Sequence, residues 1–353
     1  MRIVSFFSGA GGLDLGFKKA GFNIIWANEF DPSVYPTFER NFPKVELDKR
    51  SIVDIDPNEV PDCDGIIGGP PCQSWSAAGS GRGIKDHRGR LFINYVEIIK
   101  EKKPKFFLAE NVPGLVNKRN LDSMNNIFTP LTEIGYNVSF VLLDAHNYGV
   151  PQNRKRVIIV GYPEIYSKFF LPPSPDKKKF TLKDAIAGLE NSAVPSTKKG
   201  YSNPKVKVDN HEYMKGRNFS SHYMSRNRVR GWDEPSYTIQ ASGRHAPCHP
   251  QAPYMVKTDQ KDVFKFKEGS KRLYRRLTVR ECANIQTFPK NFFFEYKLLN
   301  NGYKMVGNAV PVVFAKRLAM QVKHDIKNFN GEMKFVNKGR LLDLRSGQFE
   351  LNL

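Results

Sequence analysis

The chain has 353 residues, 40% of them hydrophobic, which is enough for one large domain with a sizeable core and a second, smaller one. Lys and Arg number 55 against 35 Asp and Glu, and the formal net charge of +20 favours a polyanionic partner, although a solvated basic surface would carry the same charge. The four cysteines form no CxxC pair and no apolar run approaches the ~20 residues of a membrane span, which argues against a zinc site, a disulfide framework and a membrane protein.

Short apolar runs alternate with helical patterns through the first half of the chain. Strands are predicted at residues 3–7, 24–27, 65–67, 106–109, 138–143 and 156–160, and helical spacing occurs at 13–20 and 91–100. This alternation predicts a Rossmann-like α/β fold, with a mostly parallel sheet and helices on both faces. Ligands of such sheets bind beyond the carboxyl ends of the strands, where Gly9, Glu29, Cys72 and Glu110 are expected.

The composition changes after residue 172. Residues 173–272 are rich in Lys, Ser, Asn, Pro and Arg and show little periodicity, which predicts a smaller irregular domain. Helical patterns return at 277–288 and 310–326. We therefore expect a first domain at 1–172, the irregular domain at 173–272, a segment at 273–328 that packs back on the first domain, and a peripheral tail at 329–353.

A glycine-rich turn, FSGAGG at residues 7–12, follows the first predicted strand. Its glycines permit positive φ and let backbone N–H groups approach a ligand, although a purely structural turn would use the same residues. The dinucleotide fingerprint GxGxxG is not met, because residue 14 is Asp. Glu29 ends the second strand, where an acid binds the ribose hydroxyls in nucleotide-binding α/β folds. Together the turn and Glu29 predict a cofactor that contains adenosine.

The stretch IIGGPPCQSWS, at residues 66–76, places one cysteine directly after two prolines. Pro70 and Pro71 fix φ and remove two backbone donors, so the strand cannot continue. A rigid loop that presents Cys72 suits a nucleophile, which must be held in position. The alternative is a small buried cysteine packed as a hydrophobe, and the polar flank QSWS argues against it.

Further polar candidates adjoin two other strands. Glu110 ends the strand in FFLAENVP and could donate a proton or a hydrogen bond to a heterocyclic nitrogen, although many such acids cap a helix or pair with Arg. Arg154 and Arg156 lie two positions apart at the strand RVIIV, so both should point to one face. Their alternative is a pair of solvated charges at a sheet edge.

Six segments, in this order, resemble motifs of the DNA (cytosine-5)-methyltransferases, which use S-adenosylmethionine. They are FSGAGGLDLGF, GGPPCQSWS, LAENV, PQNRKR, RRLTVRECANIQTFP and GYKMVGNAVPVVFA, and they span nearly the whole chain. The stretches SRNRVR, QASGR and HPQAP carry a narrower resemblance to bacterial modification enzymes of the HaeIII type, whose target is GGCC. The resemblance implies a cytoplasmic, nucleoid-associated enzyme with a catalytic and cofactor-binding domain at 1–172 and a target-recognition domain at 173–272.

The family chemistry assigns roles to four residues. The resemblance implies that the thiolate of Cys72 adds to C6 of a cytosine flipped out of the helix, after which C5 accepts the methyl group. Glu110 would stabilise protonation at N3, and Arg154 or Arg156 would brace the flipped base. Cysteine suits this addition better than serine, because it is a soft nucleophile and partly thiolate at neutral pH.

The resemblance also implies a set of cofactor contacts and no metal. These residues are Phe7, Gly9, Gly11, Gly12, Leu13, Glu29, Ile52, Pro70, Leu91, Asn308 and Val310. Leu91 would neighbour the adenine, and Ile52 would pack beside it. The family usually places an acid near the adenine amino group; Ser51 stands at that position here, with Asp54 close by.

Target reading is expected from arginines of the irregular region. Arg226, Arg228 and Arg230 alternate in SRNRVR, so an extended segment would put them on one face. Arginine pairs bidentately with guanine O6 and N7, and GGCC offers guanines on both strands. We expect Arg226, Arg228 and Arg244 to read bases and Arg230 to bind phosphate, and phosphate contact alone is the alternative. The Gly- and Arg-rich loop after Cys72 is expected to close on DNA.

The expected partner is therefore double-stranded DNA, bound by a monomer, with a cognate restriction endonuclease as a functional rather than a stable partner. A tRNA cytosine-5-methyltransferase would share the core but carry a smaller recognition region than residues 173–272. A catalytically inert DNA-binding module would not need both Cys72 and Glu110. A Rossmann dehydrogenase would explain the glycine turn and Glu29 but not PPCQ.

Overall fold

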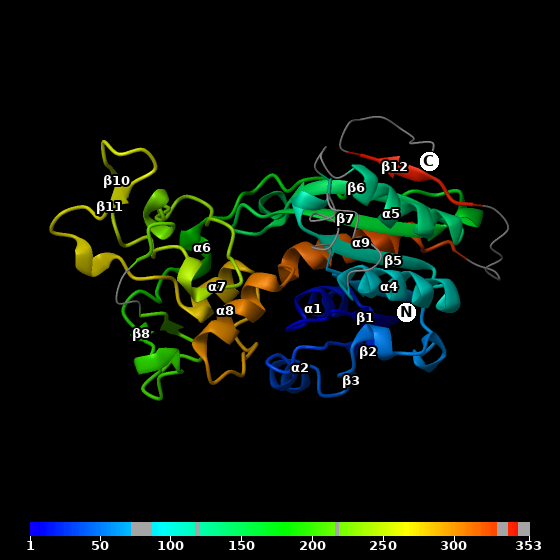
Figure 1. Ribbon diagram of the computed structural model, residues 1–353, viewed down its shortest axis with the longest axis horizontal. Helices are drawn as coiled ribbons and strands as arrows, with labels where there is room; N and C mark the ends of the chain where they lie inside the picture. The colour runs from blue at the N-terminus through cyan, green and yellow to red at the C-terminus, as the bar shows by residue number, and fades with distance from the viewer. Residues whose placement is uncertain (72–86, 117–120, 216–218, 330–337, 345–353) are drawn as a thin grey trace.

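The computed structural model describes residues 1–71, 87–116, 121–215, 219–329 and 338–344, and its centre is an eight-stranded sheet (Figure 1). The sheet is mostly parallel, as predicted; β7 runs antiparallel to both its neighbours, β5 and β6. From edge to edge the strands are β12 (Leu341–Asp343), β6 (Tyr136–Asp144), β7 (Lys155–Pro163), β5 (Phe106–Asn111), β4 (Gly65–Gly68), β1 (Arg2–Phe6), β2 (Asn23–Asn28) and β3 (Glu46–Asp48).

Helices cover both faces of this sheet. On one face pack α4 (His87–Lys102) and α5 (Leu121–Glu133), through side chains such as Tyr95 and Phe128. On the other pack α1 (Gly12–Lys19) and α9 (Val312–Asp325), through Phe17 and Phe314. Because α1 and α9 come from opposite ends of the chain and pack on each other, the C-terminal segment closes the fold beside β1. No helix within the described ranges is long and apolar enough to cross a membrane.

The tail was expected to be peripheral, and this is wrong for residues 341–343. They form β12, which pairs in parallel with β6 at the edge of the sheet. Leu341 and Leu342 are buried, with 2% and 4% exposure, and the pairing of β12 covers backbone groups of β6 that would otherwise lie at the edge of the sheet. The structure also adds α2 (Tyr35–Asn41) and β3, neither of which the sequence pattern indicated.

Residues 173–272 hold little regular structure, as their composition predicts, and lie beside the sheet (Figure 1). Their elements are α6 (Leu182–Ile186) and the strand pairs β8 (Val194–Pro195) with β9 (Glu212–Tyr213) and β10 (Val256–Lys257) with β11 (Phe264–Lys265). A small core of their own includes Tyr223, Val229 and Met255. They share a second core with α7 (Val279–Ile285), α8 (Leu299–Asn308) and α2, so residues 273–328 contact both parts, and the boundaries at 172 and 272 stay predictions.

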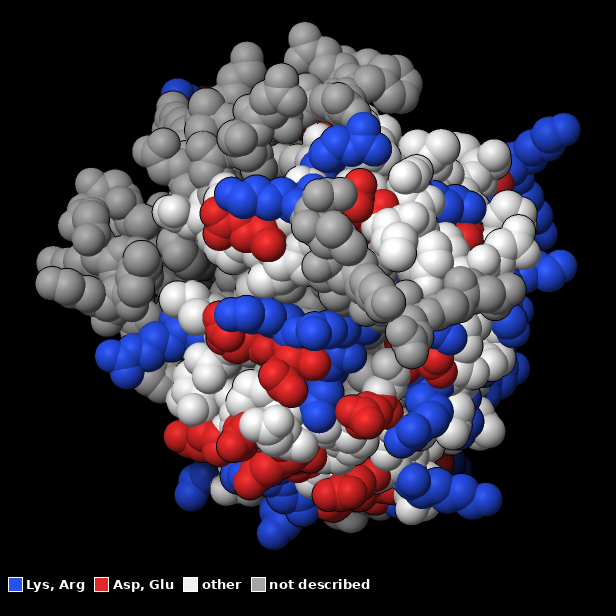
Figure 2. Space-filling view, turned by 90° about the vertical axis from the view of Figure 1, so that its right-hand side faces the viewer, with Lys and Arg blue, Asp and Glu red and all other residues white. Residues whose placement is uncertain are grey.

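The positive charge is unevenly spread along the chain. Residues 173–272 contain 20 Lys and Arg against 10 Asp and Glu, so this region carries half of the net charge of +20. Figure 2 shows the end of the molecule opposite this region, and there acidic and basic side chains are interspersed. An excess of one sign attracts a polyanion, so the irregular region is the better candidate for that contact.

Candidate active site

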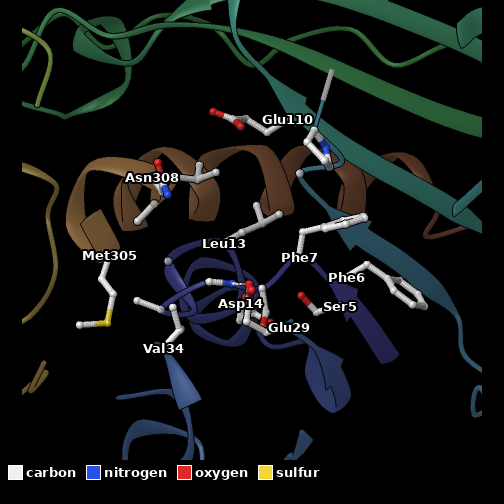
Figure 3. Close-up of a pocket in the computed structure, with 18 of the residues that line it drawn as sticks. Ser5, Phe6, Phe7, Leu13, Asp14, Glu29, Val34, Glu110, Met305 and Asn308 are labelled. Atoms are coloured by element: carbon white, nitrogen blue, oxygen red, sulfur yellow. Dashed lines mark hydrogen bonds between the residues drawn. The ribbon is translucent and has the colours of Figure 1, made fainter. Parts of the chain in front are cut away.

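A cavity of about 410 Å³ lies at the carboxyl ends of β1, β2, β4 and β5 (Figure 3). Its size falls in the range of roughly 300–1,000 Å³ that ligand sites occupy, and its place is where open α/β sheets bind ligands. The sequence-predicted residues on its wall are Phe7, Gly9, Gly12, Leu13, Glu29, Pro70, Glu110, Arg154, Arg156, Asn308 and Val310. Gly11, Ile52 and Leu91 do not line it, and Cys72, with the loop that follows, lies outside the described residues.

The turn after β1 has the unusual backbone that its glycines predict. Gly9 and Gly11 have φ of 53° and 83°, and Phe7, which is not a glycine, has φ of 53°. Left-handed conformation at a bulky residue costs on the order of 1–3 kcal/mol and tends to be kept at functional sites. A Cβ at Gly12 would lie 2.5 Å from the carbonyl oxygen of Val310, so glycine is required for α1 to approach the C-terminal segment.

Glu29 fastens this turn to the end of β2. Its carboxylate accepts hydrogen bonds from the backbone N–H groups of Gly9 and Asp31, each at 2.8 Å. Burial raises the pKa of Glu29, and these two hydrogen bonds oppose the shift. Each carboxylate oxygen keeps a lone pair with which it can accept from the hydroxyls of a ligand.

Sequence reasoning missed the residue after Glu29. Phe30 is 66% exposed, which is unusual for so large an apolar side chain. An exposed ring that directly follows an acid on the cavity wall offers a stacking surface for a planar ligand ring. The available signal was the aromatic residue immediately after the strand-ending acid.

Across the cavity, Glu110 at the end of β5 forms an ion pair with Arg156, with 2.6 Å between its Oε1 and the arginine Nε, and both side chains are 12% exposed. The loop after β4 lies beside this pair, since a Cβ at Gly69 would be 3.8 Å from Glu110 Oε2. The side-chain amide of Asn111, a residue that the sequence did not single out, donates to the carbonyl oxygen of Pro70 at 2.9 Å. The end of β5 is thereby fixed to the segment that leads into Cys72.

The three described cysteines are unsuited to nucleophilic attack. Burial raises the pKa of Cys63 to about 12 and that of Cys248 to about 11, and it also raises the pKa of Cys282. None of the three lines the cavity. Because the thiolate is the reactive form, the described part of the chain offers no competitor to Cys72.

Arg154 precedes β7 rather than lying within it, and its side chain is buried with 1% exposure. Its guanidinium donates to the carbonyl oxygens of Ile239, Gly307 and Ala309, at 3.1, 2.9 and 3.0 Å. Burial lowers the pKa of Arg154 to about 9, and the charge of Arg156 adds to the effect. Both arginines line the cavity, but Arg154 mainly cross-links three segments.

Two buried glutamines extend this cross-link. The side chain of Gln152 accepts from the backbone N–H of Ile239 at 2.7 Å and donates to Gln286 at 2.8 Å. Gln286 in turn donates to the carbonyl oxygen of Val306, also at 2.8 Å. The irregular region at Ile239, the start of β7 and the end of α8 are therefore held together by side-chain hydrogen bonds.

The predicted common face of the three alternating arginines is wrong. Arg226 is exposed, Arg228 is buried, and both line a hollow of about 190 Å³ together with Gln240 and His245. Arg230 instead pairs with Glu234, whose carboxylate also accepts from the backbone N–H of Gly231.

The surroundings of these arginines differ in kind. Arg228 donates from Nε and Nη2 to the carbonyl oxygens of Tyr223 and His222, both at 2.7 Å. Arg230 pairs with Glu234 at 2.8 Å and packs on the ring of Tyr237. Arg244 is exposed and lines a separate groove that also contains Lys199 and Lys215.

At the position where the family usually has an acid near the adenine amino group, none of the described acids reaches the cavity. Ser51 is buried and begins a short 3₁₀ turn, Ile52 to Asp54. Ile52 packs in the main core, whereas Asp54 is exposed, and neither is on the cavity wall.

These features define an α/β enzyme with a cavity at the ends of its strands. Glu29, placed as acids that bind ribose are, lies on one side of it, and the Glu110–Arg156 ion pair lies on the other. Residues 1–324 match the model of the C-5 cytosine-specific DNA methylase family, and the chain belongs to that family. The protein is therefore a DNA (cytosine-5)-methyltransferase, and membership implies a reaction that depends on S-adenosylmethionine.

Known relatives agree with this assignment over their full length. The chain is 55% identical over 328 residues to the type II methyltransferase M.MthTI of Methanothermobacter thermautotrophicus, which covers 93% of this chain and 98% of that one. It is 50% identical over 347 residues to M.FnuDI of Fusobacterium nucleatum, covering 97% and 100%. A putative DNA modification methyltransferase encoded within a prophage of E. coli shares the fold, with a TM-score of 0.68 at 21% identity over 93% of this chain and 100% of that one.

Proposed function

We propose that the enzyme methylates C5 of a cytosine within GGCC in duplex DNA, through a covalent bond between Cys72 and C6 of a flipped base. The main supporting observation is the single cavity shared by Glu29, Glu110 and Pro71, the residue before Cys72. A cofactor held at Glu29 and a base held at Glu110 would meet within it, as direct transfer requires.

S-adenosylmethionine fits the residues on the Glu29 side. Glu29 would accept from its ribose hydroxyls, and the turn from Phe7 to Leu13 would surround it, with Pro70, Asn308 and Val310 closing the wall. Phe30 does not line the cavity, but its exposed ring follows Glu29 and would stack on an adenine that extends past this acid. Gly11, Ile52 and Leu91 would act by packing behind the wall, since they do not reach the cavity. When bound, the cofactor supplies an electrophilic methyl group.

On the base side, residues of the chain carry the remaining steps. The Cys72 thiolate adds to C6, and Glu110 hydrogen-bonds N3 and the exocyclic amine, so electron density builds up at C5. C5 takes the methyl group and loses its proton to water, and the bond between Cys72 and C6 then breaks to leave 5-methylcytosine and the free thiolate. Arg156 would hold the carboxylate of Glu110 and Arg154 the surrounding segments.

Target reading is assigned to Arg226, Arg228 and Arg244. Arg230, which was expected on a phosphate, is paired with Glu234 in the free protein and is left out of this assignment. Arg228 has five N–H donors, and its Nε and Nη2 contacts with backbone carbonyls leave Nη1 for a guanine edge. The names of the relatives support a role in a type II system. The full proposal is a monomer in the bacterial cytoplasm that protects DNA from a cognate restriction endonuclease.

The chemistry is tested by trapping with duplex GGCC DNA that contains 5-fluorocytosine. Because fluorine cannot leave as a proton does, we expect a covalent complex that forms only with S-adenosylmethionine and is lost in Cys72→Ser. Cys63→Ser is the matched control and should still form it. No complex with the wild-type protein would favour an inert DNA-binding module.

The target is tested separately by bisulfite sequencing of DNA from cells that express the protein. We expect protected cytosines at one position of GGCC. Protection at another sequence would reject GGCC but keep the chemistry, and modification confined to tRNA would support the RNA alternative.

A further inference from the structure

Asp14 is a buried carboxyl group that the proposed reaction does not use. It lies in the first turn of α1 with 0% exposure, and it is on the cavity wall beside Ser5 and Glu29 (Figure 3). Among the described residues, neither of its oxygens finds a hydrogen-bond partner of normal geometry. The hydroxyl of Ser5 is close enough to lower the pKa of Asp14, and the hydroxyl of Ser8 is unpartnered. Buried polar groups are usually satisfied, so the carboxyl group of Asp14 points to a missing ligand.

The order of the strands places Asp14 next to the part of such a ligand that would carry its charge. The sheet runs β5, β4, β1, β2, with Glu110 at the end of β5 and Glu29 at the end of β2. Ser5 is on β1 and Asp14 follows β1, so both lie between these two acids. A cofactor with its ribose at Glu29 and its methyl group directed toward Glu110 must cross β1, and the part that crosses contains the sulfonium and the amino-acid end.

We propose that Asp14 is the counter-charge for this cationic end of S-adenosylmethionine, and that it distinguishes the charged cofactor from its neutral nucleoside part. The proposal rests on the proposed function, because it needs this cofactor in the cavity. The hydroxyl of Ser5 is placed to donate to the ionised carboxylate. An ionic contact in a poorly hydrated site is stronger than one at the surface.

The electrostatic setting makes the contact depend on pH. Burial, and next the charge of Glu29, raise the pKa of Asp14 to about 7, against the opposing effect of Ser5. In the empty enzyme Asp14 is thus about half protonated near pH 7, and a bound cation favours its ionised form. Cofactor binding below pH 7 must therefore expel a proton, which weakens it.

The other charged groups around Asp14 already have partners or lie apart from it. Asp31 pairs with Lys304 of α8 at 2.5 Å, and Glu110 pairs with Arg156. Arg154 is engaged with backbone carbonyl oxygens, and α9, which packs on α1, approaches Gly16 at Lys316 through its backbone. Lys18, one turn further along α1, is exposed and lies over the ring of Phe42. No described cation lowers the pKa of Asp14.

The test measures binding of S-adenosylmethionine and of adenosine by calorimetry at pH 6 and pH 8, without any activity readout. With a pKa of about 7, wild-type affinity for S-adenosylmethionine should be about tenfold weaker at pH 6 than at pH 8. Asp14→Asn should bind it about tenfold more weakly than the wild type at pH 8, with no change between the two pH values. Adenosine, which lacks both positive charges, should bind alike in every case.

Asp31→Asn is the matched control. It removes one negative charge from the same cavity wall, but that charge is already paired with Lys304, and the hydrogen bonds of Asp31 lower its pKa. This variant should keep the pH slope of the wild type. Unfolding of the empty proteins checks the fold. Since folding raises the pKa of Asp14 from 3.8 to about 7, wild-type stability should fall as pH rises between these two values and level off above about 7, whereas Asp14→Asn should lack this fall.

The cofactor and the role of Asp14 can be rejected by different results. If the wild type binds adenosine but no S-adenosylmethionine at either pH, the proposed cofactor is rejected. If Asp14→Asn matches the wild type in affinity and slope, or weakens adenosine as much as S-adenosylmethionine, the counter-charge role is overturned. Should the variant not fold, the pH dependence of wild-type binding is the deciding measurement. Equal changes in affinity between pH 6 and pH 8 for both ligands overturn the proposal, and a change for S-adenosylmethionine alone supports it.

Discussion

The cavity region and the irregular region at 173–272 place their functional side chains in opposite ways. In the first, Glu29 and Glu110 stand at strand ends, so the backbone ladder and the strand order fix them. In the second, arginine side chains hold the loops by donating to backbone carbonyls, as Arg228 does to His222 and Tyr223. A substitution in the cavity should therefore change chemistry with little effect on the fold, whereas one in the irregular region should change both.

The largest expected effect is that of Glu110→Gln. Loss of the carboxylate that hydrogen-bonds N3 should slow methyl transfer about 10²–10⁴-fold, as removal of a general acid or base does. Cofactor binding should not change, because Glu110 lies across the cavity from Glu29, but the unfolding midpoint should fall modestly, because Arg156 loses its partner. Single-turnover methylation and calorimetry measure the two quantities.

Glu29→Gln is the matched variant on the other side of the cavity. It should weaken S-adenosylmethionine binding yet keep most of the single-turnover rate at saturating cofactor. A single-turnover methylation rate for Glu110→Gln within threefold of the wild-type rate would show that Glu110 takes no part in methyl transfer.

Arg154→Met tests the cross-link between the two regions. The substitution leaves three buried carbonyl oxygens, those of Ile239, Gly307 and Ala309, without this donor, so we expect about 2–4 kcal/mol less stability in urea unfolding. Arg50→Met, at an exposed ion pair, is the control and should change the midpoint little. Equal effects for the two would show that Arg154 does not join the regions.

Much of the cavity could be predicted from the sequence, because two simple rules govern it. Apolar runs in alternation with helical patterns mark the strands, and ligands bind at their carboxyl ends, which brings Gly9, Glu29 and Glu110 together. The rules say nothing of residues that act through a specific contact. Asn111, which fixes Pro70, and Asp14, which the sequence showed only as the residue that breaks the GxGxxG pattern, were therefore missed.

The irregular region was predicted in composition but not in geometry. Residue spacing gives a common face only if the backbone is regular, and the chain from Arg226 to Arg230 forms no strand. Burial of a guanidinium depends on carbonyl groups that are brought close by the tertiary fold, which no local pattern encodes. The same limitation hid β12, since a run of three residues is too short to show periodicity.

Arg228→Ala should combine a moderate loss of stability with a loss of target choice. The side chain is 6% exposed, donates to two carbonyls and packs on the ring of Tyr223, so its removal should cost about 1–3 kcal/mol. Discrimination between GGCC and single-base variants of it should fall at one position, as competition binding can measure. A variant that loses stability but keeps full discrimination would make Arg228 a purely structural residue.

The smallest effect is expected at Arg230, and it separates the two kinds of arginine within the irregular region itself. Arg230 is already paired with Glu234 and packed on Tyr237, so Arg230→Ala should weaken GGCC binding only about twofold and barely alter the salt dependence. Exposed Arg226 has no such partner among the described residues, and Arg226→Ala should weaken binding about tenfold or more and reduce discrimination. Titrations at several salt concentrations give both numbers. If Arg230→Ala instead lowers the slope of log affinity against log salt by about one, Arg230 leaves Glu234 to neutralise a phosphate, and the pairing in the free protein does not persist on DNA.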